Sequence, residues 1–228
     1  MTAGDNAHEN GHGRSDLATR KLLILGATGA TGRHVVAMAL ERGIDVTVLV
    51  RQSEKLGTLT QRLRVLTGSV PDDPAAVAAA VAGQDAVIST LGVGTSLRSG
   101  GLIQRSMHVV VDAMRQLGVR RLIVTSAYGV GVTRRDVPPL PRVLMKLLFR
   151  DLYDDKAAGE EVVRHSGLDW TLVYPVTLTN GPQTRRYRTG ERLKLRGMPR
   201  ISRADVAHFL VGLVDDTALI GKGVLVSS

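Results

Sequence analysis

Three glycines at intervals of three follow directly on a run of aliphatic residues in the segment LLILGATGATGRHVV, residues 22–36. The aliphatic run has the composition of a buried strand, and helical spacing of apolar residues resumes after the last glycine. Gly26 permits a sharp exit from the strand, Gly29 leaves room for a ligand to approach the backbone, and Gly32 lets the helix pack tightly on the sheet. The segment is therefore typical of a strand, turn and helix whose N-terminus binds a diphosphate, with Thr28 and Thr31 as hydroxyl donors.

The rest of the chain alternates between short β-branched runs and helical stretches. Strands are predicted at 21–25, 45–50, 63–67, 85–90, 120–125, 169–174 and 223–227, and helices at 30–42, 72–82, 101–117, 140–166 and 202–214. Strands that are apolar on both faces and joined by helices indicate a parallel sheet covered on both sides. The sequence therefore predicts an α/β, doubly wound parallel sheet, the Rossmann fold, in one domain.

Composition leads to expectations about the domain boundaries and the cellular location of the protein. The first 19 residues are polar and aperiodic, which predicts a disordered leader before a domain at 20–228. With neither a long apolar segment nor an apolar signal sequence, we expect a cytoplasmic protein without a membrane span. The chain has no cysteine, so any chemistry depends on hydroxyls, lysines, histidines, carboxylates or a cofactor.

The net charge of +9 raises the question of nucleic-acid binding, because basic surfaces attract phosphate. Aromatic residues make up only 3% of the chain, and no DNA-binding motif spacing occurs, so we interpret the charge as a solvated surface. The densest basic run, 185–203, alternates in its middle as a hairpin does. It lies within the segment 176–203, which we expect on the substrate side of the site.

The end of the second predicted strand bears on which dinucleotide is bound. In DVTVLVRQSEK, the position at which an NAD enzyme has an acidic residue is occupied by Arg51, with Lys55 just beyond. A guanidinium can pair with a 2′-phosphate through two parallel hydrogen bonds, which favours NADP(H). The alternative is that Arg51 is only a surface charge at a strand end.

Five segments together resemble a known family: GATGATG, VTVLVR, GQDAVISTLG, VRRLIVTSAYG and RHSGLDWTLVYP. In order and spacing they are similar to the atypical short-chain dehydrogenase/reductases with an NAD(P)H-binding domain, most of all to the flavin reductase or biliverdin reductase B group. The resemblance runs from about residue 21 to the C-terminus. It implies that the glycine turn holds the pyrophosphate, that the turn after the third strand contacts adenine, and that the ends of strands four to six surround the nicotinamide. The cofactor-binding residues so implied are Gly26, Thr28, Gly29, Ala30, Thr31, Gly32, Arg51, Ser69, Val70, Leu91, Gly92, Ser126 and Pro175.

The chain departs from this family at several positions. The family commonly has Gly-Asp after strand three, whereas this chain has Gly68 followed by Ser69. Typical short-chain dehydrogenases use Asn, Ser, Tyr and Lys, with Tyr and Lys four residues apart. Here the comparable pair, Tyr153 and Lys156, is three apart, and Val176 stands where the bilin and flavin reductase has a histidine.

Lys156 lies on an otherwise apolar helical stripe with Leu152, Gly159 and Val163. It either reaches the ribose or phosphate of the cofactor, or packs its stem on the core with the ammonium in solvent. Tyr153 lies about 60° around the same helix, close enough to share the cleft.

Ser126, at the end of the fifth strand, could bond a substrate carbonyl or the nicotinamide carboxamide, or be a plain strand-end hydroxyl. Tyr128 is a second donor candidate or a wall for a flat substrate. Four histidines within predicted helices form neither a metal set nor a catalytic triad, and no metal is expected: His34, His108, His165 and His208.

These features predict an NADPH-dependent oxidoreductase that transfers hydride to a conjugated carbonyl, quinone, flavin or similar small molecule, either anionic or aromatic. Without a Tyr-Lys pair at the usual interval, an acceptor that itself delocalises negative charge is favoured over an unactivated ketone. The alternative is a non-catalytic NADP(H)-binding redox sensor, like the nitrogen-metabolite-repression regulators. The missing Tyr-Lys spacing also disfavours a sugar-nucleotide epimerase.

Overall fold

The computed structural model describes residues 20–94, 96, 98–136, 149–195 and 197–228. The predicted leader at 1–19 and residues 140–148 of the predicted helix at 140–166 lie outside these residues. Among the described residues, none of the helices is long and apolar enough to cross a membrane.

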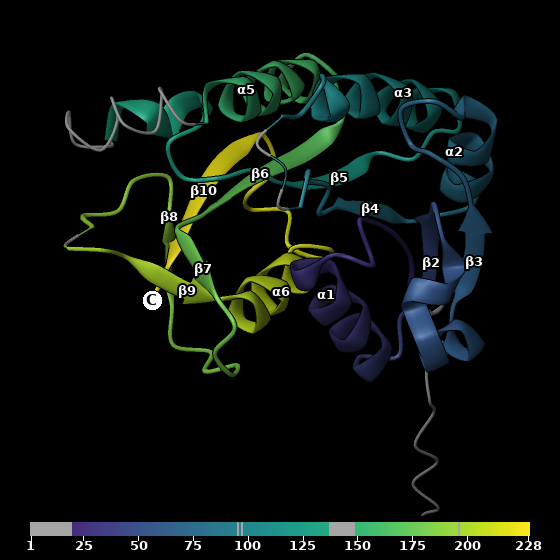
Figure 1. The fold of residues 1–228 in the computed structure, drawn as a ribbon, viewed down its shortest axis with the longest axis horizontal. Helices are drawn as coiled ribbons and strands as arrows, with labels where there is room; N and C mark the ends of the chain where they lie inside the picture. Colours follow the sequence, from purple (N-terminus) through teal and green to yellow (C-terminus); the bar gives the residue numbers. More distant parts are fainter. Residues whose placement is uncertain (1–19, 95, 97, 137–148, 196) are drawn as a thin grey trace, which may run out of the picture.

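One eight-stranded sheet forms the centre of the fold, in the order β3-β2-β1-β4-β5-β6-β10-β8 (Figure 1). Its strands are β1 (Lys21–Leu25), β2 (Asp45–Val50), β3 (Arg64–Thr67), β4 (Ala86–Ser89), β5 (Arg121–Thr125), β6 (Asp169–Pro175), β8 (Arg188–Gly190) and β10 (Lys222–Ser227). All neighbours pair in parallel except β8, which runs antiparallel to β10 at the edge. The predicted parallel sheet is confirmed, with an antiparallel edge strand added.

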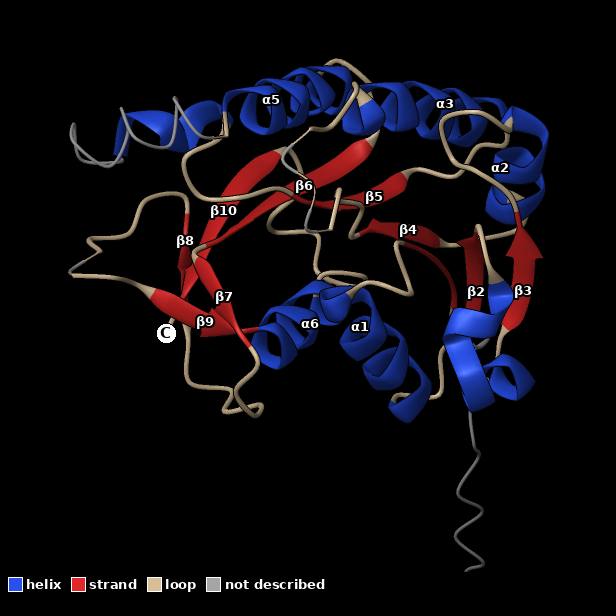
Figure 2. Cartoon of the chain, in the orientation of Figure 1, coloured by secondary structure: helices blue, strands red, loops and turns tan. Residues whose placement is uncertain are grey.

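Helices cover both faces of this sheet, as Figure 2 shows. One face carries α1 (Ala30–Glu41) and α6 (Arg203–Gly212), and the other carries α2 (Pro74–Val81), α3 (Leu102–Gln116) and α5 (Arg150–Arg164). Alternate residues of β1 enter the two cores: Leu22 and Ile24 pack on the α1 side, Leu23 and Leu25 on the α3 side. The doubly wound α/β fold is confirmed.

The strand order determines where a ligand can bind. Strands run outward from β1 in one direction through β2 and β3, and in the other through β4, β5 and β6. Open α/β sheets bind ligands beyond the carboxyl ends of the strands where the order reverses, which here is the gap between β1 and β4. The glycine turn follows β1 directly, so it lies at this crevice.

The basic segment differs from its prediction. Residues 188–190 form β8 and pair with β10, whereas β9 (Arg200–Ser202) pairs in parallel with β7 (Thr177–Thr179) in a separate two-stranded sheet. The predicted hairpin within 185–203 is therefore wrong. Both strands have only three residues, too few for an alternating pattern to identify the partner strand.

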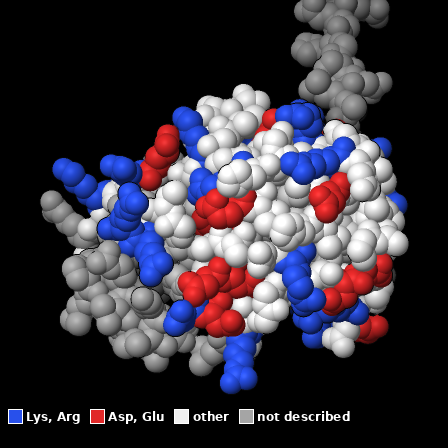
Figure 3. Space-filling model, turned by 90° about the horizontal axis from the view of Figure 1, so that it is seen from above, with Lys and Arg blue, Asp and Glu red and all other residues white. Residues whose placement is uncertain are grey.

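Two 3₁₀ segments, η1 (Ser53–Arg62) and η2 (Gly131–Asp136), were also not predicted. On the face drawn in Figure 3, acidic side chains lie among the basic ones. The charges on that face are therefore mixed, and neither positive nor negative side chains cover it alone.

Candidate functional site

The glycine turn is closed tightly against the end of β4. Gly26 has φ +81°, and a Cβ on it would lie 2.8 Å from the Thr90 carbonyl oxygen. A Cβ on Gly32 would lie 2.1 Å from the Gly26 carbonyl oxygen, so the start of α1 packs directly on the turn. Thr90 fixes this contact, because its hydroxyl donates to the Leu25 carbonyl at 3.0 Å and to the Gly26 carbonyl at 3.3 Å. Thr90 was missed from the sequence, although it follows β4 next to the predicted Leu91 and Gly92.

The N-terminus of α1 has the backbone donors that an anion needs. Gly29 is the N-cap, with no side-chain hydrogen bond to the cap. The first amide bonded back along the helix is that of Arg33, at 3.0 Å from the Gly29 carbonyl oxygen. Within the part of the chain that the structure describes, the first α1 amides therefore have no partner in the helix, and they present its positive dipole end to the crevice. Gly29 and Ala30 are exposed there, and Thr28 and Thr31 are half-buried. These residues fit a diphosphate.

Two arginines lie where the adenosine end of a dinucleotide would extend. Arg51 follows β2 and is exposed, as is Lys55 in η1. Arg33, not identified from the sequence, bridges the turn and η1: its Nε donates to the Thr28 carbonyl at 3.2 Å, and its Nη2 to the Lys55 carbonyl. The Arg33 guanidinium thus holds the glycine turn and the segment after Arg51 together.

The turn after β3 is compact. A Cβ on Gly68 would lie 2.7 Å from the Cβ of Ala76 in α2. The Ser69 hydroxyl donates to Asp72 at 2.8 Å, while Val70 is buried in the core, so only its backbone can face a ligand. This turn carries two carboxylates, Asp72 and the α2 N-cap Asp73, three and four residues beyond the position at which the family commonly has one.

Ser126 meets a buried carboxylate. Its hydroxyl donates to Glu160 Oε1 at 2.5 Å, and the Tyr174 hydroxyl donates to Glu160 Oε2 at 2.7 Å. Arg164 donates to the Tyr174 hydroxyl at 2.8 Å and lies 3.6 Å from Glu160 Oε2. Glu160 is 3% exposed, and a Cβ on Gly131 would lie 2.0 Å from its Oε2. Residues from β6, α5, η2 and the segment directly after β5 thus enclose one carboxyl group.

Burial dominates the ionisation of this group. Desolvation raises the pKa of Glu160, against the hydrogen bonds from Ser126 and Tyr174 and the charge of Arg164, which favour the ionised form. Burial also raises the pKa of Tyr174, and the neighbouring Glu160 raises it further, so Tyr174 remains a neutral donor. Glu160 was missed from the sequence: it lies one position after Gly159, where a glutamate looks like part of the solvent-facing side of the helix.

Lys156 is half-buried on α5, one turn before Glu160. Desolvation lowers the pKa of Lys156, and the charges of Glu160 and Asp155 oppose that shift. Asp155 itself accepts from the Ile103 and Gln104 amides at 3.0 and 2.9 Å, so it joins α5 to the start of α3. Two buried carboxylates, Glu160 and Asp155, therefore attract the Lys156 ammonium.

The remaining predicted side chains lie around this network. Tyr153 is half-buried, its ring centroid lies 6.5 Å from that of Phe149, and burial raises its pKa. The Tyr128 amide donates to the Pro175 carbonyl at 3.0 Å, which brings the segment after β5 beside the end of β6. Ser126, Tyr128 and Pro175 therefore share one edge of the sheet. Tyr153 and Lys156 lie on α5. Among the described residues, the hydrogen bond between Ser126 and that helix is the one to Glu160.

Asp205 anchors the start of the basic segment to α6. It accepts from the amides of Thr184 and Arg185, both at 2.8 Å, and from the hydroxyls of Thr184 and Ser202, both at 2.9 Å. Desolvation disfavours its charge, but these hydrogen bonds outweigh it and lower the pKa of Asp205.

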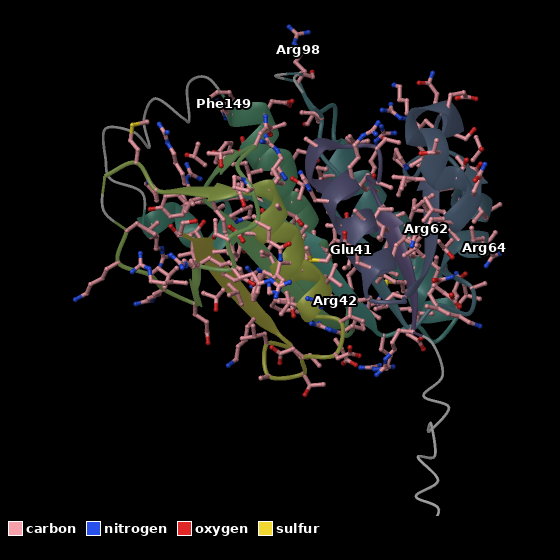
Figure 4. All side chains as sticks on the ribbon, turned by 90° about the horizontal axis from the view of Figure 1, so that it is seen from below. Glu41, Arg42, Arg62, Arg64, Arg98 and Phe149 are labelled. Atoms are coloured by element: carbon pink, nitrogen blue, oxygen red, sulfur yellow. The ribbon has the colours of Figure 1, made fainter. Side chains whose placement is uncertain are left out.

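Beside Asp205, the Tyr187 hydroxyl lies 2.6 Å from His208 Nδ1. Burial first, and then the charges of Arg42 and Arg185, lower the pKa of His208. Arg42 lies at the end of α1 in Figure 4, whereas Arg98 projects away from the body of the protein.

Comparisons with known proteins show which family the chain belongs to. A family described as NAD(P)H-binding matches residues 26–217. A chloroplastic protein of Arabidopsis thaliana, itself uncharacterised, is 30% identical over 188 residues, which are 77% of this chain and 65% of that protein. Phenylcoumaran benzylic ether reductase PT1 of Pinus taeda is 27% identical over 164 residues, 67% of this chain and 47% of that protein.

This chain thus spans about half to two thirds of the length of these two relatives. Among solved structures, ChuY, an anaerobillin reductase from Escherichia coli O157:H7, superposes with a TM-score of 0.76 at 23% identity, covering 90% of this chain and 96% of that one. At that identity, the likeness shows the fold. The glycine turn, the strand order and the match over 26–217 together identify the chain as a member of the NAD(P)H-binding family, with reductases among its relatives.

Proposed function

We propose that the protein is an NADPH-dependent reductase that transfers hydride to a conjugated carbonyl, quinone, flavin or similar small-molecule acceptor. One observation carries the proposal: the open N-terminus of α1 and the Ser126–Glu160 network lie at the carboxyl ends of β1 and β5, in one parallel sheet. β4 lies between those two strands, so the sites are about 10 Å apart across the sheet. A dinucleotide bound at the turn would extend across that edge.

The cofactor, when bound, supplies the hydride. The chain supplies binding and orientation. The α1 amides, with Thr28 and Thr31, would hold the diphosphate, and Arg51 would pair with a 2′-phosphate. The exposed guanidinium of Arg51 supports NADP(H), because it is the cation directly after β2.

The reacting end of the site favours an acceptor that delocalises charge. Tyr153 and Lys156 are three residues apart on α5, and Lys156 is attracted to Glu160 and Asp155. A tyrosine made acidic by a neighbouring lysine is therefore not the arrangement here, and burial raises the pKa of Tyr153. Quinones, flavins and enones accept hydride without such an acid. Tyr128 or water would then give the proton.

The segment 176–203 would border the substrate. Asp205 anchors its start, and several of its arginines are exposed: Arg185, Arg186, Arg188, Arg192 and Arg200. These cations would suit an anionic acceptor.

The test is loss of NADPH absorbance against a panel of flavins, quinones and enones, with Gly32→Ala as the control for the cofactor site. The reductase predicts turnover with at least one acceptor, and that turnover is lost in the control.

A second candidate is the non-catalytic NADP(H)-binding sensor. For this candidate the buried Ser126–Glu160 pair would be structural, with the serine hydroxyl bonded inside the protein and not to an acceptor. Tight NADPH binding without oxidation by any acceptor in the panel would support the sensor and contradict the reductase.

A further inference from the structure

The Ser126 hydroxyl donates its hydrogen bond to a buried residue of the protein. Its oxygen lies 2.5 Å from Glu160 Oε1, and the two residues are 6% and 3% exposed. The hydrogen bond runs from the Ser126 hydroxyl to Glu160 Oε1, so the serine is the donor. The lone pairs of the Ser126 oxygen are what remains for a ligand.

Several neighbours of Glu160 favour its ionised form and oppose the burial that raises its pKa. Tyr174 donates to the other carboxylate oxygen at 2.7 Å, and Arg164 lies 3.6 Å from it. Lys156 is attracted to the same carboxylate from one helical turn away. Two hydroxyl donors and two cations thus face Glu160 from β6, from the end of β5 and from α5 itself.

Ser126 is held in place by the sheet as well. Its amide donates to the Val173 carbonyl at 2.8 Å, which continues the pairing of β5 with β6. The backbone fixes the residue, and Glu160 fixes the rotation of its hydroxyl. A ligand group that meets Ser126 must therefore bring its own N–H or O–H.

We propose that Glu160 is a positioning residue that makes Ser126 a hydrogen-bond acceptor toward the cleft, and that Ser126 accepts from the carboxamide N–H of the nicotinamide. This inference rests on the proposed binding of NADP(H). The carboxamide is the neutral donor that a nicotinamide presents beside its reactive carbon. Ser126 then orients the ring instead of giving a proton to the acceptor.

An analogue of the cofactor tests this proposal by binding alone. The 3-acetylpyridine analogue of NADP⁺ replaces the carboxamide NH₂ with a methyl group of similar size and keeps the carbonyl. Dissociation constants for NADP⁺ and for this analogue are measured by calorimetry on the wild type, Ser126→Ala, Glu160→Gln and Tyr174→Phe. Thermal unfolding of each variant accompanies the titrations.

We expect the wild type to prefer NADP⁺ by about five- to tenfold, as one hydrogen bond would give. Ser126→Ala should lose the preference. Glu160→Gln should lose or reverse it, because its amide can donate to Ser126 and free the serine proton for a carbonyl. Tyr174→Phe is the matched control: it removes the bond to the other oxygen of Glu160 and should keep the preference.

Three results would overturn the proposal. Equal wild-type affinity for the two nucleotides would show that Ser126 does not accept from the carboxamide. A preference for NADP⁺ that persists in Ser126→Ala would also show that Ser126 does not accept from the carboxamide. Glu160 is unchanged in this variant. A preference that persists in folded Glu160→Gln would remove Glu160 from the role. If neither nucleotide bound the wild type, the proposed cofactor site would fail as well, which distinguishes that outcome from the others.

Discussion

Gly32→Ala perturbs the turn at its tightest point. The added Cβ would lie 2.1 Å from the Gly26 carbonyl oxygen, 2.8 Å from the Gly26 carbonyl carbon and 2.9 Å from Thr90 Oγ1. Two of these atoms are backbone, so the turn itself must move. Overpacking of this kind costs about 3 kcal/mol, and alanine in place of glycine in a helix returns about 1 kcal/mol. We therefore expect a net loss of about 2 kcal/mol in the free energy of unfolding.

Gly212→Ala is the matched control, because Gly212 is also helical and a Cβ there meets nothing within 4 Å. It should be neutral or stabilising. Urea unfolding measures the stability, and fluorescence titration measures NADPH affinity, which should fall at least about tenfold in Gly32→Ala because the α1 amides move with the turn. Wild-type stability and affinity in Gly32→Ala would refute the packing argument.

Three further predictions concern single side chains. Arg51→Ala should weaken NADPH far more than NADH, since only NADPH carries the 2′-phosphate; equal losses in titrations of both would contradict that pairing. Ser126→Ala should reduce steady-state turnover while changing NADPH affinity by no more than about tenfold, and unchanged rates would exclude Ser126 from the reaction. Asp205→Asn should lower the free energy of unfolding by about 2 kcal/mol at neutral pH, because the carboxylate accepts four hydrogen bonds. The folded pKa of Asp205 lies below its ordinary value of 3.8, so this stabilisation exists above that pH and is lost as pH falls through the folded value; a pH-independent difference in urea unfolding would contradict it.

The glycine turn could be predicted because its chemistry is local. Gly26, Gly29 and Gly32 follow a strand and open a helix, and the structure gives Gly26 the positive φ and Gly32 the tight packing expected of glycine. The parallel sheet followed in the same way, from strands that are apolar on both faces. Each of these signals lies within a short window of sequence.

The Ser126–Glu160 network could not be predicted, because it joins residues distant in sequence. Glu160 lies 34 residues after Ser126 and 14 before Tyr174. Helical periodicity assigned Lys156 and Gly159 to the inward stripe, and Glu160 is enclosed only because η2 approaches α5 so closely that Gly131 has no room for a side chain. The roles of β8 and β9 were missed for a related reason, since tertiary packing selects their partners.

The central claim is that the turn between β1 and α1 binds the diphosphate of NADPH. Calorimetric titration of the full chain with NADPH tests it most directly. We predict saturable binding of one NADPH per chain that is weakened in Gly32→Ala and kept in Gly212→Ala. Absence of binding to the wild type, or binding that is unaffected by Gly32→Ala, would contradict the claim.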